Sequence, residues 1–349
     1  SLTFVLILRR NSLLQKCKVY TCVPSLSCCL SVSLFDNEQL DKNITANAID
    51  IIALFMRNWH DESLTKNNDC PWIEDSNYAM EVCQQLDIPF QTIDLSKEYK
   101  ERIVDYMINA YAQGKTPNPD ILCNREIKFD VFLKYALSLK ADCIATGHYC
   151  IKIKNKNKYS LKQGHDPLKD QSYFLCQINQ QQLEKVIFPI GHLTKKEVRE
   201  IAKKENLITA KKKDSQGLCF VGKIKLPVFL QTKLKPNTGD IIEIHQESNI
   251  YKSKPKEGIK YKKTDGEKIG NHNGAHYFTI GQRKGLNIGG TTNPLFVIYT
   301  DVKSNIVFVG MGENHPGLFR NSLQIKNTEL HWIQEEEYLK DGQSANYLV

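Results

Sequence analysis

The first half of the chain alternates short apolar runs with longer stretches of helical periodicity. Residues 51–56, 90–95 and 143–146 are apolar segments of strand length, as is typical of strands buried in a parallel sheet. Helical spacing predicts helices over residues 72–86, 97–113, 124–139 and 193–205. Gly114 follows the second of these as a helix stop signal. This alternation predicts an α/β domain with a doubly wound parallel sheet.

The pattern changes after about residue 240. Short apolar segments separated by turns predict strands at residues 241–245, 276–280, 295–300 and 306–309. We therefore expect a β-rich second half, built as a small barrel or sandwich. Lysine-rich runs at residues 152–158, 195–204 and 252–263 are typical of solvated faces, although a polyanion can use them.

Composition narrows the class of protein. The chain has 349 residues, enough for two or three domains, with 41% hydrophobic and 25% charged residues, as in globular proteins. The formal net charge of +8 permits a polyanionic partner without requiring one. No apolar segment is long enough to span a bilayer, so we expect a soluble protein without a membrane partner.

The N-terminal third has an unusual composition. Residues 1–35 contain no Asp or Glu and are rich in Ser, which indicates a transit peptide or non-native sequence; we favour the second. The chain begins with Ser, so we expect the true start to be missing. All 19 glycines lie at or after Gly114, which excludes a glycine-rich phosphate loop from the first third.

Two of the 11 cysteines have settings that suit chemistry. Cys123 follows a rigid proline loop (TPNPD) at a predicted helix start, where the helix dipole stabilises a thiolate, and Asp120 lies three residues earlier. An equally weighted alternative is a buried Cys123 with Asp120 as helix cap. Cys219 lies between two glycines with lysines just upstream, although a turn with an inward cysteine is the stronger interpretation of that segment alone. The cysteines show neither C-x-x-C pairs nor zinc-finger spacing, which favours a reducing compartment and no bound metal.

Two further segments are candidates for binding. KDQSYF, at residues 169–174, combines charge with aromatic residues, as RNA contacts do, although a helix cap is the more common explanation. His148 follows Gly147 at a predicted strand end, where α/β sheets place ligands, but a single histidine is more often structural.

Taken together, these motifs resemble the tRNA-specific 2-thiouridylases from about residue 51 to about residue 333. The motifs that carry the resemblance are FMRNW, GKTPNPDILCNREIKF, ATGHY, KDQSYFL, FPIG, DSQGLCFVG, HYFTIGQRKGLNIGG, NHPGL and LHWI. The resemblance implies an ATP-dependent transfer of sulfur from a cysteine persulfide to C2 of the tRNA wobble uridine, through an adenylated intermediate. In that chemistry Cys219 carries the persulfide, Cys123 assists its release and ends in a disulfide with Cys219, and Asp120 is the acid/base partner.

The resemblance also implies binding residues and partners. The target base would contact Asn118, Pro119 and Asp120, and other parts of the tRNA would contact His148, Lys169, Asp170 and Gln171. Met56 and Gly147 would line the ATP pocket, with Mg²⁺ accompanying ATP. The expected partners are tRNAs that accept Lys, Glu and Gln, and a sulfur donor such as a cysteine desulfurase or a sulfur relay protein. We expect a cytoplasmic protein, or a mitochondrial matrix protein if the N-terminus is a transit peptide.

The resemblance gives an expected architecture of four parts. Residues 1–49 would be a non-family or replaced segment, and residues 50–208 an adenine nucleotide alpha hydrolase-like domain of the PP-loop type without its loop. Residues 209–285 would form a small central domain with the second cysteine, and residues 286–349 an incomplete, truncated C-terminal β-barrel. Two other functions stay open. One is a catalytically inactive tRNA-binding fragment that lacks the ATP phosphate loop, and the other is a cysteine hydrolase or amidotransferase that uses Cys123 with His148.

Overall fold

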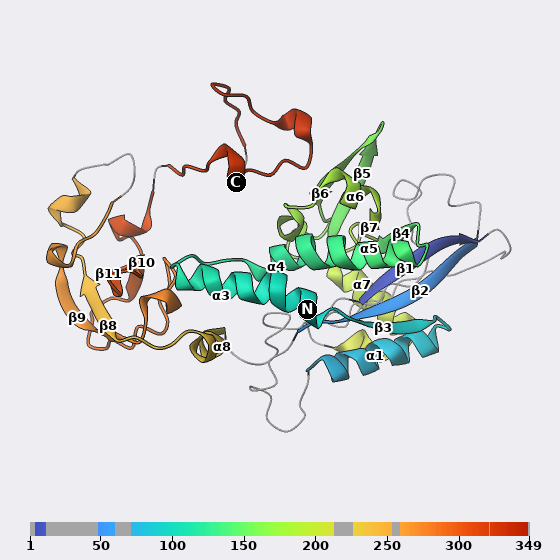
Figure 1. The fold of residues 1–349 in the computed structure, drawn as a ribbon, viewed down its shortest axis with the longest axis horizontal. Coiled ribbons are helices and arrows are strands. Elements are labelled where there is room, and N and C mark those ends of the chain that lie inside the picture. The colour runs from blue at the N-terminus through green and yellow to red at the C-terminus, as the bar shows by residue number, and fades with distance from the viewer. Residues whose placement is uncertain are drawn as a thin grey trace. The chain divides into compact units, whose positions relative to one another are not determined.

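The computed structural model describes residues 4–11, 48–59, 71–212, 226–252, 259–320 and 322–347, and their elements are labelled in Figure 1. The chain divides into two compact units. The first comprises Ser1–Ile103, Pro119–Ile224 and His331–Val349, and the second comprises Val104–Asn118 and Lys225–Leu330.

A five-stranded sheet in the order β3-β2-β1-β4-β7 forms the centre of the first unit. Its strands are β1 (Phe4–Asn11), β2 (Ala48–Arg57), β3 (Phe90–Asp94), β4 (Cys143–Ala145) and β7 (Val186–Ile187). The pairs β2–β3 and β4–β7 are parallel, as predicted. The prediction of an entirely parallel sheet is wrong at β1, which lies between β2 and β4 and runs antiparallel to both. An apolar run encodes burial but not direction, because side chains alternate identically in parallel and antiparallel strands.

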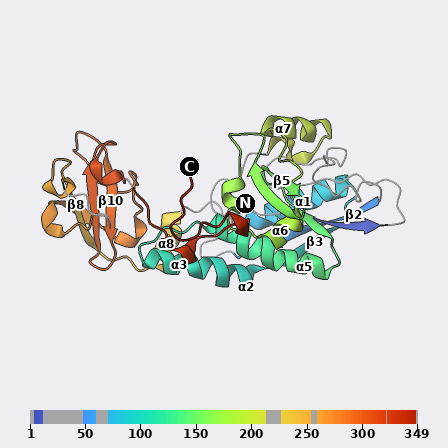
Figure 2. The ribbon, with the colours of Figure 1, turned by 90° about the horizontal axis from the view of Figure 1, so that it is seen from above.

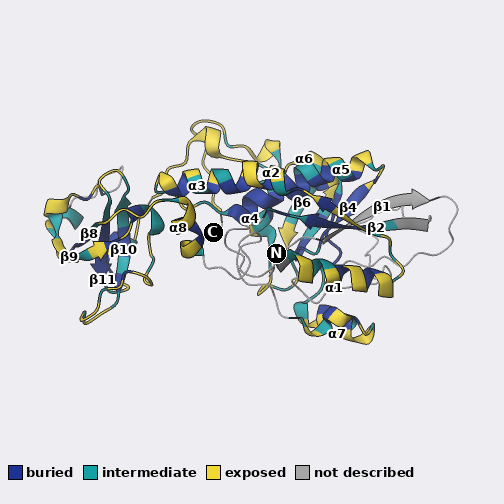
Figure 3. Cartoon of the chain, turned by 60° about the horizontal axis from the view of Figure 1, so that its bottom comes forward, coloured by how far each residue is buried: buried dark blue, intermediate teal, exposed yellow. Residues whose placement is uncertain are grey.

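Helices lie on both faces of this sheet. Figure 3 shows α1 and α7 on one side of the strands and α5 on the other. The helices of the first unit are α1 (Pro71–Gln85), α2 (Ser96–Tyr99), α4 (Pro119–Leu122), α5 (Leu133–Ser138), α6 (Gln180–Glu184) and α7 (Lys195–Lys204). A π-helical stretch, Cys123–Phe132, joins α4 to α5, so the helix predicted from residue 124 begins at Pro119. Proline is favourable there because the first helical turn has unpaired N–H groups in any case.

Shorter elements complete the first unit. They are a hairpin of β5 (Cys150–Asn155) and β6 (Lys158–Gln163), the 3₁₀ turns Ser172–Leu175 and Ile208–Lys211, and the start of a π-helical segment, Lys100–Val104. None of the helices in the described ranges combines the length and apolar composition that crossing a bilayer requires.

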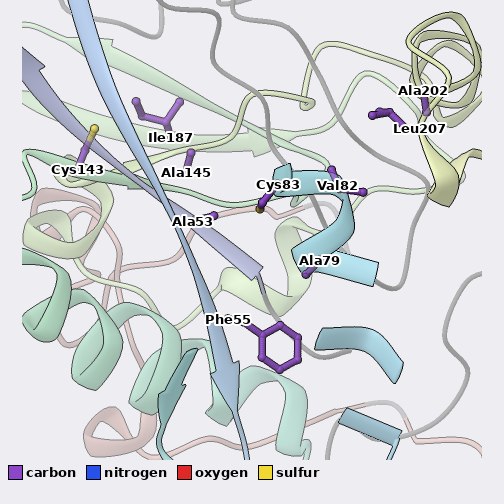
Figure 4. Close-up of a cluster of buried hydrophobic side chains, with 10 residues drawn as sticks. All are labelled: Ala53, Phe55, Ala79, Val82, Cys83, Cys143, Ala145, Ile187, Ala202 and Leu207. Carbon is purple, nitrogen blue, oxygen red and sulfur yellow. The ribbon is translucent and has the colours of Figure 1, made fainter. Parts of the chain in front are cut away.

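The core on the α1 side of the sheet consists largely of small side chains (Figure 4). Ala53 and Phe55 of β2 lie on the same face, because alternate strand residues share a face. The other buried members of this cluster are Ala79, Val82, Cys83, Cys143, Ala145, Ile187, Ala202 and Leu207. Such small residues allow α1 and α7 to pack closely against the strands.

The second unit is built on a four-stranded sheet in the order β10-β11-β8-β9. Its strands are β8 (Gly239–Glu243), β9 (Glu267–His272), β10 (Leu295–Asp301) and β11 (Ile306–Met311), and its helices are α3 (Asp105–Ala112) and α8 (Leu226–Lys233). The boundary expected after residue 285 falls between β9 and β10 of this single sheet. Across the part of the chain that the structure describes, these strands form an open sheet rather than a closed barrel.

Two turns of the second unit depend on glycine. The predicted strand at residues 276–280 is wrong: Ala275–Tyr277 is a 3₁₀ turn, entered from Gly274 at φ 146°. A backbone turn of this kind overrides the β pattern of the residues that follow it. Gly114 ends α3 as predicted, with φ 76° and with the N–H of Lys115 donating to the carbonyl of Ala110 at 2.9 Å.

Candidate functional site

The first candidate cysteine lies inside the helix that begins at Pro119. Cys123 is fully buried, in the second helical turn, and Asp120 is half-buried one turn earlier. Residues three apart are neighbours on a helix, so Asp120 and Cys123 share one face. Because the effect of the helix dipole declines beyond the first turn, the helix N-terminus stabilises a negative charge on Asp120 more strongly than on Cys123.

Asn124 fixes this helix to the segment that follows the KDQ motif. Its side chain is 2% exposed, and its Nδ2 donates to the carbonyl of Phe174 at 2.8 Å. Its Oδ1 is buried without a hydrogen-bond partner. Next to it, Arg125 donates from Nη1 to Oε1 of Gln177 at 2.8 Å. The helix carrying Cys123 is therefore held against residues 174–177 by side chains that the sequence did not single out.

His148 is buried at the carboxyl end of β4. A 2.8 Å hydrogen bond joins its Nδ1 to Oγ1 of Thr146, and its ring lies 5.9 Å from that of Phe129 and 6.1 Å from that of Phe188. Burial lowers the pKa of His148 well below its usual range, and the charge of Lys128 lowers it further. The imidazole is therefore neutral near pH 7.

Asp170 and Gln171 shape the loop beside His148. The carboxylate of Asp170 accepts from the N–H of Gly164 at 3.0 Å and from the hydroxyl of Ser172 at 2.8 Å. Gln171 pairs twice with Tyr149: its N–H donates to the Tyr149 carbonyl, and its Oε1 accepts from the Tyr149 N–H, both at 3.0 Å. These two side chains thus bind the protein's own backbone and order the loop that presents the exposed Lys169.

Thr146, Asn124 and Lys128 are the residues of this site that sequence reasoning missed. All three are buried. The hydrogen-bond partners of buried polar residues depend on tertiary contacts, which the sequence does not show. The only available signal was their position within the motifs ATGHY and CNREIKF.

Comparison with known proteins shows which family has these motifs. Residues 36–223 match the family described as tRNA methyl transferase HUP domain, and residues 228–311 match the tRNA methyl transferase PRC-barrel domain. The tRNA-specific 2-thiouridylase MnmA of Flavobacterium johnsoniae is 57% identical over 317 residues, which cover 86% of this chain and 80% of that protein. The protein of the same name from Christiangramia forsetii is 56% identical, with coverage of 82% and 77%. That from Halalkalibacterium halodurans is 42% identical, with coverage of 85% and 75%.

This chain belongs to the tRNA-specific 2-thiouridylase family. A HUP domain is therefore followed by a PRC-barrel domain, and the PRC-barrel match falls within the second compact unit. The comparisons do not favour the alternative of an inactive tRNA-binding fragment, because the relatives are named as thiouridylases.

The HUP domain of a 2-thiouridylase suggests ATP binding, and the buried polar groups at the end of β2 fit its nucleoside part. Met56 is fully buried, and just beyond it Asn58 is buried with neither amide atom hydrogen-bonded. An amide offers both the donor and the acceptor that an adenine edge needs. The described residues fit the phosphates of ATP less well. A phosphate loop relies on glycines, and the chain has none before Gly114. The described part of β1 ends at Asn11, which pairs with Ala48 at the start of β2. Among the described residues, those named here fit adenosine and form no phosphate cradle.

The second cysteine of this 2-thiouridylase, Cys219, lies outside the described residues, as does the rest of residues 213–225. The last described residue before them is firmly held. Nζ of Lys212 lies 2.6 Å from a carboxylate oxygen of Asp75 on α1 and 3.9 Å from the ring centre of Tyr78. The side chain of Lys212, the residue that precedes this segment, is therefore anchored to α1.

Proposed function

We propose that this chain transfers sulfur to C2 of the wobble uridine of tRNA in an ATP-dependent reaction. The observation that carries the proposal is the 57% identity to a protein named tRNA-specific 2-thiouridylase across 80% of its length. The helix that brings Asp120 and Cys123 onto one face also supports it. When bound, ATP would make the C2 oxygen of the uridine a good leaving group.

The two cysteines would divide the sulfur chemistry. Cys219 would carry the transferable sulfur as a persulfide, loaded by a cysteine desulfurase or a sulfur relay protein. The thiolate of Cys123 would attack Sγ of Cys219, so that the persulfide bond breaks and hydrosulfide leaves with the bonding electron pair to displace the activated oxygen at C2. The product is a disulfide between Cys123 and Cys219, and an external thiol would return both cysteines to the reduced state with two electrons.

The start of the Cys123 helix would receive the target base. Asn118 and Pro119 would contact the flipped uridine, and Asp120 would act as the acid/base group. Two features support this assignment. Pro119 is buried and restricts the backbone, and Asp120 is half-buried, so that part of its carboxylate stays accessible.

The loop beside His148 would hold the tRNA. The exposed Lys169 would pair with phosphate, while Asp170 and Gln171 would keep the loop in shape through their backbone contacts. The neutral His148 would contact the tRNA through hydrogen bonds rather than charge.

We further propose that Met56 and Gly147 line the ATP pocket and that Mg²⁺ accompanies ATP. The tRNAs that accept Lys, Glu and Gln are the expected substrates. The bacterial relatives support a reaction in the cytoplasm.

The test is thiolation of a tRNA transcript with a wobble uridine, in the presence of ATP, Mg²⁺, a thiol and a persulfide-forming sulfur source. Mass spectrometry of the nucleosides should detect 2-thiouridine with the wild-type chain and none with Cys219→Ala, while tRNA binding persists in both. Equal product with and without Cys219, or product without ATP, would overturn the proposal.

A further inference from the structure

The first unit has a basic groove of about 550 Å³ next to α7. Six of its eight lining residues are Lys or Arg, and one is acidic. The lining residues are Lys169, Lys195, Lys196, Arg199, Glu200, Lys203, Ala210 and Lys211. This composition gives the groove a strong excess of positive charge.

The positive charge comes from side chains and not from the helix end. The start of α7 is already satisfied by a capping box between Thr194 and Glu197, and the N–H of Lys195 donates to Asp166 at 3.0 Å. Glu200, the acidic lining residue, lies 3.9 Å from Lys196, and both side chains are mostly exposed. Such an exposed ion pair offsets little of the positive charge of the groove.

The cations are regularly spaced along the helix. Lys195, Arg199 and Lys203 are four residues apart, so they form one stripe along α7 in which the Cβ atoms of neighbours lie about 5–6 Å apart. A repeat of this kind suits a ligand with charges at regular intervals along a chain, and the sugar-phosphate backbone of a nucleic acid is such a ligand.

One loop connects the groove to the candidate site. Residues 164–171 are bonded to Tyr149 through Gln171 and to the start of α7 through Asp166, and they end in the Lys169–Gln171 stretch that borders both regions. A nucleic-acid strand bound in the groove would therefore pass Lys169 and reach the loop beside His148.

The lining favours RNA over a protein partner. Protein interfaces place aromatic anchors at their centre, whereas none of the described residues that line this groove is aromatic, and its walls are largely the aliphatic stems of lysine and arginine. Phosphate contacts, in contrast, need only cations on flexible stems.

We propose that this groove binds the sugar-phosphate backbone of the tRNA outside the wobble position, an inference that rests on the proposed function. Lys196, Arg199 and Lys203 would contribute affinity that is independent of base sequence. The groove would thereby hold the tRNA body while the target base enters the site near Cys123.

The test compares Lys196→Glu/Lys203→Glu with the control Lys97→Glu/Lys162→Glu, which makes the same charge change at exposed positions of this unit outside the groove. Binding of an unmodified tRNA transcript is measured by fluorescence anisotropy over a range of salt concentrations. The groove variant should bind roughly tenfold more weakly or worse, and its salt slope should fall by roughly 1.4–1.8 if two phosphate contacts are lost. The control should keep the wild-type slope, and equal melting temperatures would show that both variants fold.

Thiolation separates failure of the groove from failure of the function. The groove variant should show a raised KM for tRNA and a kcat close to that of the wild type. An unchanged salt slope and an unchanged KM would overturn the proposal that the groove binds tRNA, while the proposed thiolation activity would stand. Unchanged tRNA binding, with loss of thiolation only when a donor protein supplies the sulfur, would mark the groove as a protein-docking surface and also overturn the proposal. If the wild type makes no 2-thiouridine, the binding slopes still test the groove.

Discussion

The helix that carries Cys123 and the basic groove belong to the same unit but are built in opposite ways (Figure 2 gives a second view of this unit). In the site, Cys123 and Asn124 are at most 2% exposed, and packing fixes their positions. In the groove, the side chain of Lys196 is 87% exposed. We therefore expect the number of cations in the groove to matter more than the position of any one. We infer that changes in the site act almost all-or-none, whereas changes in the groove act in steps.

The largest effect should come from Cys123→Ala. Removing the thiol that we propose releases the sulfur should lower thiolation on the order of 10³-fold or more, since no other side chain of the described site can supply this nucleophile. Mass spectrometry of the nucleosides measures the amount of 2-thiouridine formed, and the affinity for tRNA should be unchanged.

The matched control for this variant is Cys83→Ala, a buried cysteine of the α1 core. It should cost some stability and keep activity per folded molecule. Retention of more than a tenth of the activity by Cys123→Ala would contradict the role given to that thiol.

Asn124→Ala should have the next largest effect. It removes the 2.8 Å bond to the part-buried Phe174 carbonyl, at a cost of about 1 kcal/mol in the free energy of unfolding. Displacement of the helix start should lower kcat about 10–100-fold. Urea unfolding and thiolation kinetics measure the two effects, and Arg125→Ala, which removes a less buried contact, should do less. Equal losses of stability and of kcat in both variants would contradict a specific role of Asn124 in positioning the helix start.

Acid should lower the free energy of unfolding, and the buried His148 should be one of the residues responsible. Its pKa is lowered in the folded state, so below about pH 6.5 the unfolded chain binds the proton and the folded chain does not. This contribution to stability is therefore complete above pH 6.5 and declines as the pH falls, by up to about 2 kcal/mol at pH 5.

The measurement is urea unfolding from pH 7 to pH 5. His148→Gln should make the dependence shallower without abolishing it, because burial also lowers the pKa values of His272, His276 and His315. In contrast, His165→Gln, at an exposed position, should leave the dependence as in the wild type. Parallel curves for wild type and His148→Gln would show that this histidine does not sense the pH.

The smallest effect should come from a single change in the groove. Lys203→Ala removes one of six cations, so tRNA binding should weaken only about two- to fivefold, with a salt slope lower by about 0.7–0.9. Anisotropy titrations measure both, and the melting temperature should not change. A loss as large as that of the double groove variant would show that the groove acts through one critical contact rather than through summed charge.

Much of the first unit was predictable from the sequence. Residues 51–56 and 143–146 were predictable as strands because these apolar runs are shorter than a typical buried helix. The helices follow from their periodicity. The antiparallel direction of β1 was not predictable, since alternation carries no direction. The strand expected at residues 276–280 failed because Gly274 starts a turn, and the positive φ of that glycine is set by its surroundings.

The sequence by itself determined the family and indicated the residues that we propose carry the chemistry, because ordered motifs such as TPNPDILC and KDQSYF can be read directly along the chain. Only the tertiary structure decided what those residues touch. Asp170 and Gln171 bind backbone across the loop, and His148 loses its charge between Phe129 and Phe188. The lysine run at residues 195–204 indicated only a solvated face. It became a groove when folding brought Lys169 and Lys211 beside α7, because a concave charged surface requires segments that are distant in sequence to meet in space.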